Sequence, residues 1–374
     1  MTGQAPIWLI LIAFICALGP LVFFHELGHY LVGRWFGVGA ETFSIGFGRE
    51  IFGWTDRRGT RWKVGWLPLG GYVKFVGDMN PASAPADPDD VPQELRSRSF
   101  HLKPVWQRFL IVLAGPVANF LLAILIFASF FAFVGTPQTN VVGAVQVGSA
   151  AERAGIRPGD RLRSVAGRET PTFGDVFNTV ALRPRETVTI LVERNEAQVA
   201  LRATLGTAPV QDGSRTLERG LLGVSPDLEV RNPVSVVEAL PMAADYTARL
   251  TITMVDGLIQ LVRGKISPEQ LGGPLKIAQV AGEGASQGLL PFVALVALIS
   301  INLGFINLLP VPMLDGGHLL FYGIEAVRRR PVSPQTMEWA FRGGLAALLA
   351  LVVFTTINDL GSFGLWQSLE RLIG

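Results

Sequence analysis

A His-Glu-x-x-His pattern lies near the start of the chain, at His25, Glu26 and His29. On a helix these two histidines are one turn apart on one face, so both imidazoles can bind one zinc ion. Glu26 is then placed to act as a general base toward water at the metal. A chance match, or histidines that cap a helix end, is the alternative. The pattern directly follows an uncharged run of 18 residues. Ionisable groups at membrane depth are costly and usually functional, which favours a metal site.

A catalytic zinc site needs a third protein ligand and leaves the fourth position for water. The candidates are Asp315, His318 and His101. Asp315 directly follows an apolar run and His318 lies three residues later, so the residues alone prefer neither strongly, whereas His101 lies in a polar loop. Asp315 has a second interpretation as the N-cap of a helix that starts near Gly316.

The segment from Asn302 to Pro312 is a second candidate for chemistry. Pro310 and Pro312 prevent regular helix and release backbone carbonyl groups near the proposed metal. Within a membrane such backbone is tolerated only where it lines a cavity or is covered by protein. Asn302 and Asn307 are predicted to hydrogen-bond an unwound substrate strand. Asparagines that tie helices together around a structural kink are the alternative.

The chain that must position these residues is strongly apolar. Of its 374 residues 49% are hydrophobic and 17% are charged, and the mean hydropathy is +0.39, which is typical of a membrane protein. The net charge of +2 gives no case for nucleic acid as a partner. Four segments are predicted to span the membrane, the last of them the shortest: Ile7–Phe24, Phe109–Val134, Leu289–Leu309 and Gly343–Ile357.

The distribution of basic residues predicts the orientation. Lys and Arg are frequent from Arg34 to Arg108 and again from Arg328 to Arg342, so both loops are predicted to face the cytoplasm. The long segment between the second and third spans is predicted to lie on the opposite side, because long segments translocate regardless of charge. No Lys or Arg precedes Arg34, so the first span is interpreted as a membrane helix rather than a cleaved signal peptide.

Two stretches outside the spans predict β-structure. Arg61–Val76 mixes β-branched, aromatic and glycine residues and, with a turn at Asp56–Gly59, predicts a hairpin, either dipping into the bilayer edge or soluble. Asn140–Ala203 has valine-rich strands around a short helix at Ala150–Ala154 and predicts a small α/β module. Asn232–Gly288 has the periodicity of an amphipathic helix at the membrane surface.

Five motifs, in this order, resemble the site-2 protease family and, within it, the bacterial regulator-of-sigma-E-protease branch. They are His25–His29, Gly70–Phe75, Gly115–Asn119, Gly273–Leu275 and Asn307–His318. The resemblance covers nearly the whole chain. It implies zinc as the cofactor and Asp315, rather than His318, as the third ligand.

The resemblance also implies how a substrate is handled. Asn307 and Pro310 would act on the unwound substrate. The hairpin would be membrane-associated, and its segment Gly65–Phe75, which includes Gly70, Gly71 and Tyr72, would pair with the substrate as an added strand.

The α/β module resembles a PDZ domain of the circularly permuted bacterial kind, with Ala154–Asp160 as its recognisable turn. The best-known members of the branch carry two such domains in tandem. This chain has room for one between Thr136 and Arg231, so a filter built from two stacked PDZ domains is not expected.

The expected fold is a polytopic α-helical membrane protein with four transmembrane helices, a membrane-associated β-hairpin and one extracytoplasmic PDZ-like α/β domain. The expected segments are 1–34 (first span with the metal motif), 35–103 (cytoplasmic loop with the hairpin), 104–135 (second span), 136–230 (PDZ-like domain), 231–288 (amphipathic helical segment), 289–318 (third span with the aspartate motif) and 319–374 (loop, fourth span and tail).

The expected function is that of an intramembrane zinc metalloprotease in the bacterial inner membrane, with its PDZ-like domain in the periplasm. Its substrates would be single-span membrane proteins, for which the resemblance implies anti-sigma factors and remnant signal peptides. A non-enzymatic PDZ scaffold that binds exported proteins and a zinc transporter are the alternatives. The intact His/Glu/His/Asp set argues against the scaffold, and no second metal path is visible for a transporter.

Overall fold

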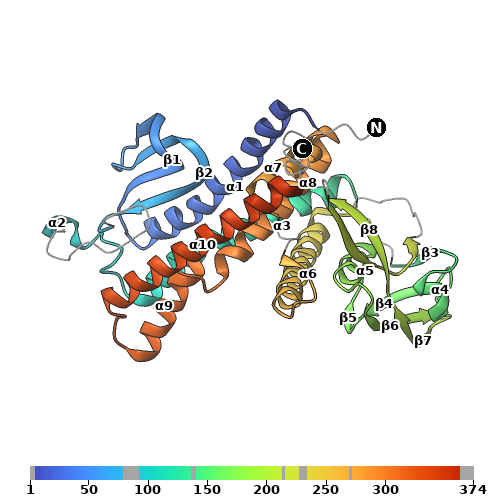
Figure 1. The fold of residues 1–374 in the computed structure, drawn as a ribbon. Coiled ribbons are helices and arrows are strands. Elements are labelled where there is room, and N and C mark those ends of the chain that lie inside the picture. The colour runs from blue at the N-terminus through green and yellow to red at the C-terminus, as the bar shows by residue number, and fades with distance from the viewer. Residues whose placement is uncertain are drawn as a thin grey trace, which may run out of the picture. The chain divides into compact units, whose positions relative to one another are not determined.

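The computed structural model describes residues 5–78, 92–135, 140–212, 215–226, 234–268 and 272–362. The chain forms two compact units, whose elements are labelled in Figure 1. The first unit comprises Met1–Ile126 and Pro274–Phe354, and the second Phe127–Gly273 and Thr355–Gly374. The predicted domain boundaries at residues 136, 230 and 231 lie outside the described residues.

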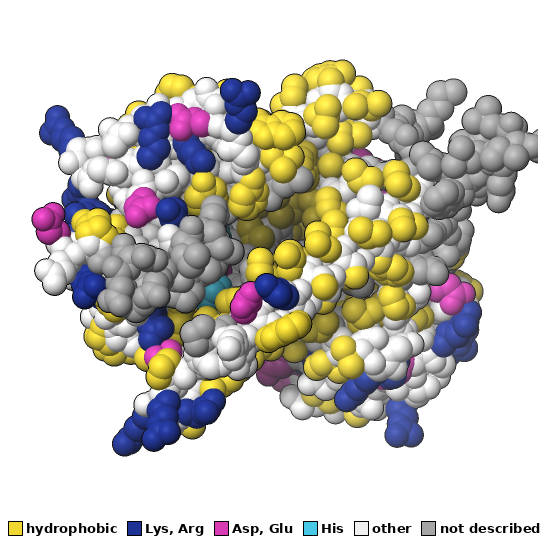
Figure 2. Space-filling model, turned by 60° about the vertical axis from the view of Figure 1, so that its left-hand side comes forward, with side chains coloured by type: hydrophobic (Ala, Val, Ile, Leu, Met, Phe, Trp, Pro, Cys, Tyr) yellow, Lys and Arg dark blue, Asp and Glu magenta, His cyan; other side chains and the backbone are white. Residues whose placement is uncertain are grey.

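Four helices in the described part of the chain are long and apolar enough to cross a membrane, as predicted. They are α1 (Ile7–Trp35), α3 (Val105–Phe133), α8 (Leu289–Leu308) and α10 (Pro334–Ser362). At most 28% of the most apolar window of each helix is buried inside the protein, so the remaining side chains require an apolar solvent. Figure 2 shows the broad apolar areas that result on one face.

The fourth helix is longer than the predicted span Gly343–Ile357. It begins nine residues earlier and takes in the charged residues Glu338 and Arg342, one helical turn apart. These two side chains form an ion pair at 2.6 Å, which lets them remain in the first turns of the helix.

Strands β1 (Ala40–Thr55) and β2 (Arg61–Phe75) pair antiparallel beside α1, on either side of the turn at Asp56–Gly59 (Figure 1). Asp56 closes the turn, because its Oδ1 accepts hydrogen bonds from two backbone N–H groups of the turn. Its Oδ2 accepts from the indole of Trp62 at 3.0 Å and from the hydroxyl of Tyr30 at 3.4 Å. Since Tyr30 lies on α1, these bonds tie the hairpin to the first helix.

The connection from α8 to α9 (Asp315–Arg328) is short and irregular. α8 continues as regular helix through Leu308, so the non-helical backbone is shorter than the predicted run from Asn302 to Pro312. The reason is that a proline disfavours helix from the residue before it, not several residues earlier. Met313 in this connection adopts a φ of +83°, in the left-handed region that side chains disfavour.

Two glycines let α9 start against this connection. A Cβ on Gly316 would lie 2.1 Å from the carbonyl oxygen of Leu309, and one on Gly317 would lie 2.5 Å from that of Val311. Farther along, Glu325 accepts an ion-paired hydrogen bond at 2.7 Å from Arg108 on α3. These contacts fix both ends of α9 and thereby the place of its first residue, the aspartate. The first unit also contains α2 (Gln93–Arg96) and α7 (Pro274–Ser286), which packs along α1.

The second unit contains a four-stranded antiparallel sheet of order β5–β4–β6–β7. Its strands are β4 (Arg161–Val165), β5 (Arg168–Glu169), β6 (Thr187–Arg194) and β7 (Ala197–Thr204). In β6 every second side chain is buried, namely Val188, Ile190 and Val192, as expected for a strand with one face on a core. The helices α4 (Ala150–Ala154) and α5 (Phe173–Ala181) complete this α/β module, and residues of α4 and α5 join its core.

Two smaller strand pairs and a long helix accompany the module. The strand pairs are β3 (Val142–Val145) with β10 (Val224–Pro226) and β8 (Gly206–Asp212) with β9 (Arg215–Leu221). The helix α6 (Val236–Val262) starts with a capping box formed by Ser235 and Glu238. Farther along α6, Asp256 forms ion pairs with Arg183 and, at 3.4 Å, with Arg168, so the helix is anchored to the module.

Candidate active site

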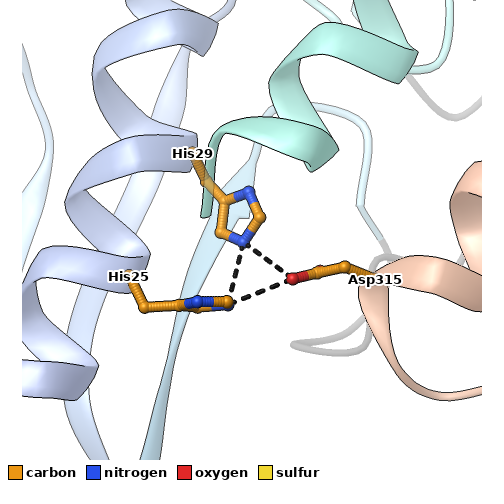
Figure 3. A group of neighbouring side chains, drawn as sticks. All are labelled: His25, His29 and Asp315. Carbon is orange, nitrogen blue, oxygen red and sulfur yellow. Dashed lines mark hydrogen bonds and ion pairs between the residues drawn. The ribbon is translucent and has the colours of Figure 1, made fainter. Parts of the chain in front are cut away.

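His25, His29 and Asp315 meet in the first unit, and Figure 3 shows their side chains pointing toward one another. The two histidines project from one face of α1, one turn apart, and the aspartate is the first residue of α9. Oδ2 of Asp315 lies 3.1 Å from Nε2 of His25 and 3.5 Å from Nε2 of His29, and the two Nε2 atoms are 3.3 Å apart. The histidines are 8% and 9% exposed.

These three atoms fit one divalent metal ion. Oδ2 of Asp315 is buried and makes no hydrogen bond of acceptable geometry within the described residues, although two nitrogens lie nearby. Buried polar atoms in proteins are normally satisfied, so an orphaned acceptor indicates a missing partner. Two imidazole nitrogens and one carboxylate oxygen are a donor set of catalytic zinc sites, which leaves the fourth position open.

The other candidates for a third ligand are placed differently. His101 makes a hydrogen bond of 2.8 Å with Asp78. His318 lines the same cavity as the cluster, but its ring packs on Phe341 with 5.0 Å between the ring centroids. Asp315 does not cap α9, because the N-cap position is the preceding leucine and no side-chain capping bond is made. Its carboxylate is therefore available to a metal.

A cavity of about 460 Å³ adjoins the cluster. Its walls come from α1, β1, β2, the segment before α3, α3, α8, the α8–α9 connection, α9 and α10. Besides the three cluster residues they include Val22, Glu26, Gly70, Gly71, Tyr72, Val73, Asn307, Met313 and His318. The predicted catalytic glutamate thus shares one cavity with the predicted ligands and with most of the predicted substrate contacts.

Glu26 is 8% exposed and lies against β2. Gly71 makes this possible, because a Cβ at that position would lie 3.0 Å from Cγ of Glu26 and 2.6 Å from Val22. The glycine therefore brings the backbone of β2 directly against the metal-motif turn of α1.

Two predicted substrate contacts are absent from the lining of this cavity. Asn302 is five residues before Asn307 on α8, which places the two side chains on different sides of a helix with 3.6 residues per turn. Asn307 lines the cavity, whereas Asn302 is exposed. Pro310 is also exposed, in the connection that follows α8.

α3 contributes contacts to which the sequence-based predictions gave no role. Nδ1 of His29 donates to the carbonyl oxygen of Ile111 at 2.9 Å, so in the neutral imidazole Nε2 is unprotonated and able to bind a metal. The side-chain amide of Asn119 lies 3.1 Å from Nδ1 of His25. A Cβ on Gly115 would lie 2.2 Å from Nε2 of His29, so only glycine lets α3 pass this close. The sequence did contain a signal for these contacts: a glycine, Gly115, is followed four residues later by an asparagine, Asn119, inside an apolar span.

A largely buried His-His-Asp cluster beside a glutamate, in a protein with four helices able to span a membrane, defines a membrane-bound metalloprotease. Comparison with known sequences leads to the same class. The sequence profile of peptidase family M50 matches residues 13–351. A Rhizobium meliloti (strain 1021) protein named "Putative zinc metalloprotease" is 44% identical over 355 residues, which cover 93% of this chain and 95% of the relative.

Two further relatives extend the comparison. A Mesorhizobium japonicum protein of the same printed description is 44% identical over 359 residues, covering 94% of this chain and 98% of the relative. "Metalloprotease MmpA" of Caulobacter vibrioides is 37% identical over 391 residues, covering 97% of this chain and 98% of its own. The chain belongs to peptidase family M50, the site-2 protease family, and is a zinc-dependent metalloprotease.

Proposed function

We propose that this protein is an intramembrane protease whose zinc ion is held by His25, His29 and Asp315. The observation that carries the proposal is the convergence of these three side chains in one cavity with Glu26, at the end of an apolar helix. When bound, zinc supplies Lewis-acid polarisation of the scissile carbonyl and acidifies a water molecule. Glu26 accepts the proton of the attacking water and delivers it to the leaving amine.

The substrate would be bound in an extended form along β2. Residues 71–75 of β2 pair with β1 along one edge, and among the described residues no strand lies along their other edge. An unpaired edge can accept another strand through main-chain hydrogen bonds. Gly70, Gly71 and Tyr72 lie on this strand and line the cavity. Asn307, on α8, would hydrogen-bond the same unwound segment.

We propose that the hairpin is associated with the membrane. Its side chains include Ile51, Phe52 and Trp66, which are 71%, 63% and 63% exposed. Apolar groups of this size, clustered on one two-stranded sheet, are stabilised by contact with lipid or with an apolar substrate segment.

The proposed orientation in the membrane is based on the distribution of arginines, and the proposed substrate class is based on the family. Arg34 at the end of α1, Arg108 near the start of α3 and the three arginines at 328–330 would face the cytoplasm of a bacterial inner membrane. The α/β module would then lie in the periplasm as a single PDZ-like domain. The substrates would be single-span membrane proteins such as anti-sigma factors and remnant signal peptides, cleaved within the membrane.

The test is a Glu26→Gln variant, purified and reconstituted beside the wild type. The variant should keep about one zinc per chain and lose cleavage of single-span peptides by about 10²–10⁴-fold, the usual contribution of a general base. Glu50→Gln on the exposed part of the hairpin is the matched control and should cleave like the wild type. Cleavage by Glu26→Gln at the wild-type rate contradicts the mechanism. A wild type that binds zinc and peptide without cleaving it supports the scaffold instead.

A further inference from the structure

Asn119 is a fully buried amide in the middle of α3, with 0% of its surface exposed. Burying an amide in an apolar helix is unfavourable unless the amide makes hydrogen bonds. Within the described residues its side chain makes one, between Nδ2 and Nδ1 of His25 at 3.1 Å, while Oδ1 has none. The one polar contact of this side chain is therefore with a proposed zinc ligand.

The chemistry of His25 determines which end of the amide faces it. Nε2 of His25 points to the centre of the cluster, 3.1 Å from Oδ2 of Asp315. A neutral imidazole that offers Nε2 to a metal carries its proton on Nδ1, which is then a donor and needs an acceptor. The two ends of an amide have the same shape, so the hydrogen-bond network decides their assignment, and here it places Oδ1 of Asn119 opposite Nδ1.

The second histidine of the motif shows the same arrangement. Nδ1 of His29 donates to a backbone carbonyl, that of Ile111, eight residues before Asn119 on the same helix. α3 thus presents one oxygen acceptor to each histidine of α1. The backbone of Asn119 is held by its helix, and its carbonyl oxygen also accepts a hydrogen bond from the hydroxyl of Ser300 on α8 at 2.8 Å, a contact that does not involve the amide.

We propose that Asn119 is a positioning residue, whose Oδ1 accepts the Nδ1–H of His25 and holds the ring in the tautomer and orientation that offer Nε2 to zinc. The inference rests on the proposed function, in which His25 is a ligand. Partners of this kind, one shell outside the metal, typically contribute 10- to 100-fold to metal affinity.

The experiment measures zinc affinity on the purified full chain in detergent, by competition with a chromophoric chelator, and records the visible spectrum with cobalt in place of zinc. Asn119→Leu removes the acceptor at similar volume, and Asn119→Ala removes it without steric conflict. Both should weaken zinc binding by about 10- to 100-fold and alter the cobalt spectrum. Asn119→Asp keeps an acceptor and should restore affinity to within a few-fold.

Ser300→Ala is the matched control, because it removes a hydrogen bond to the backbone of the same residue and leaves the amide in place. It should bind zinc like the wild type. Wild-type affinity and spectrum in both Asn119→Leu and Asn119→Ala would overturn the positioning role, as would an equal loss in Ser300→Ala. Asp315→Ala separates this result from failure of the proposed function: if it binds zinc like the wild type, the ligand set itself is wrong.

Discussion

Two aspartates with buried carboxylate oxygens, one in each unit of the protein, differ in their hydrogen bonds. Asp160 in the α/β module is 1% exposed and its carboxylate accepts hydrogen bonds from Nε and Nη2 of Arg194, both at 2.7 Å, and from the backbone N–H of Arg157 at 2.8 Å. Oδ2 of Asp315 accepts none within the described residues. Both oxygens of the first carboxylate therefore have hydrogen-bond donors, whereas Oδ2 of the second has none among the described residues.

Two buried asparagines repeat the contrast. Asn140 in the second unit donates from Nδ2 to the carbonyl oxygens of Leu162 and Thr170, at 3.0 and 3.1 Å, and so joins three segments of the module. Among the described residues, the side chain of Asn119 has a single partner, His25. Buried polar groups are normally satisfied, and Asn119 and Asp315, each with an unsatisfied oxygen among the described residues, both lie next to His25, which indicates a missing partner at this place.

The largest effect that tests this contrast is expected for Asp315→Asn. The change keeps the shape of the side chain but removes the negative charge that completes the proposed donor set. Bound zinc should fall from about one ion per chain to near zero, and cleavage of single-span peptides should be lost with it. Metal analysis and a peptide-cleavage assay measure both. Asp160→Asn should retain its zinc, and a similar zinc loss in both variants would remove the distinction between the two aspartates.

A smaller loss of metal affinity is expected for Gly115→Ala. Its new Cβ would lie 2.2 Å from Nε2 of His29, so the imidazole must move away from the metal position. We expect zinc affinity to fall by at least about tenfold, equivalent to about 1.4 kcal/mol, in the same chelator competition.

Gly323→Ala on α9 is the control for a glycine in a helix. Nothing lies within 4 Å of its added Cβ, so helix propensity alone acts, and the change should stabilise the protein by up to about 1 kcal/mol without altering zinc binding. Equal zinc affinity in Gly115→Ala and the wild type would show that α3 does not confine His29.

The Asp160 carboxylate predicts a pH effect on stability rather than on metal binding. Burial raises the pKa of Asp160, but the hydrogen bonds and charges of Arg194 and Arg157 outweigh it and hold the pKa below its usual range. Its stabilising contribution is therefore complete above the unfolded value of about 4 and is lost as the pH falls through the lower, folded value. Asp160→Asn should cost about 1–3 kcal/mol at neutral pH.

Thermal unfolding of the full chain, followed at several pH values, measures this loss. The difference between the wild type and Asp160→Asn should narrow as the pH falls below about 4, because the wild-type carboxyl is then protonated. A difference that stays constant down to pH 2 would contradict the assignment of the effect to this carboxylate.

The smallest effect is expected for Glu218→Gln, which removes an ion pair of 2.7 Å with Arg185. The side chain of Glu218 is 48% exposed and that of Arg185 is 71% exposed. Water already solvates both charges, so the ion pair contributes little to the free energy of unfolding. The free energy of unfolding should change by less than about 0.5 kcal/mol, and zinc binding should stay the same. A loss of stability as large as that of Asp160→Asn would mean that burial does not explain the difference between the exposed pair Glu218–Arg185 and the buried pair Asp160–Arg194.

Local sequence patterns were sufficient to predict part of this structure. The four spans follow from uninterrupted apolar runs, and α4 lies at the predicted Ala150–Ala154, where it ends at Gly155 with a φ of +82°. The helix α5 was missed although its capping box, Thr172 and Asp175, is visible in the sequence. It has only nine residues, and three of them, Gly174, Asp175 and Asn178, are turn-forming, so no clear helical period is visible.

Local sequence patterns were sufficient to predict only part of the candidate site. The spacing of His25 and His29 requires only one helix, whereas the choice of Asp315 needed the resemblance to a family, because the residues alone left His318 open. The contacts of Asn119 and Gly115 depend on how α1 packs against α3, which no local pattern encodes. The opposite placement of Asn302 and Asn307 depends on where α8 ends.

The glycine contact between α3 and His29 has a consequence for the design of inhibitors. The backbone of α3 occupies the side of the imidazole that a larger residue at Gly115 would fill, so no chelating group fits between them. Gly70 and Gly71, by contrast, line the cavity at a part of β2 that carries no side chains. A hydroxamate warhead should therefore be attached to an extended peptide-like backbone that runs along β2, and compounds whose bulk projects toward α3 should not bind.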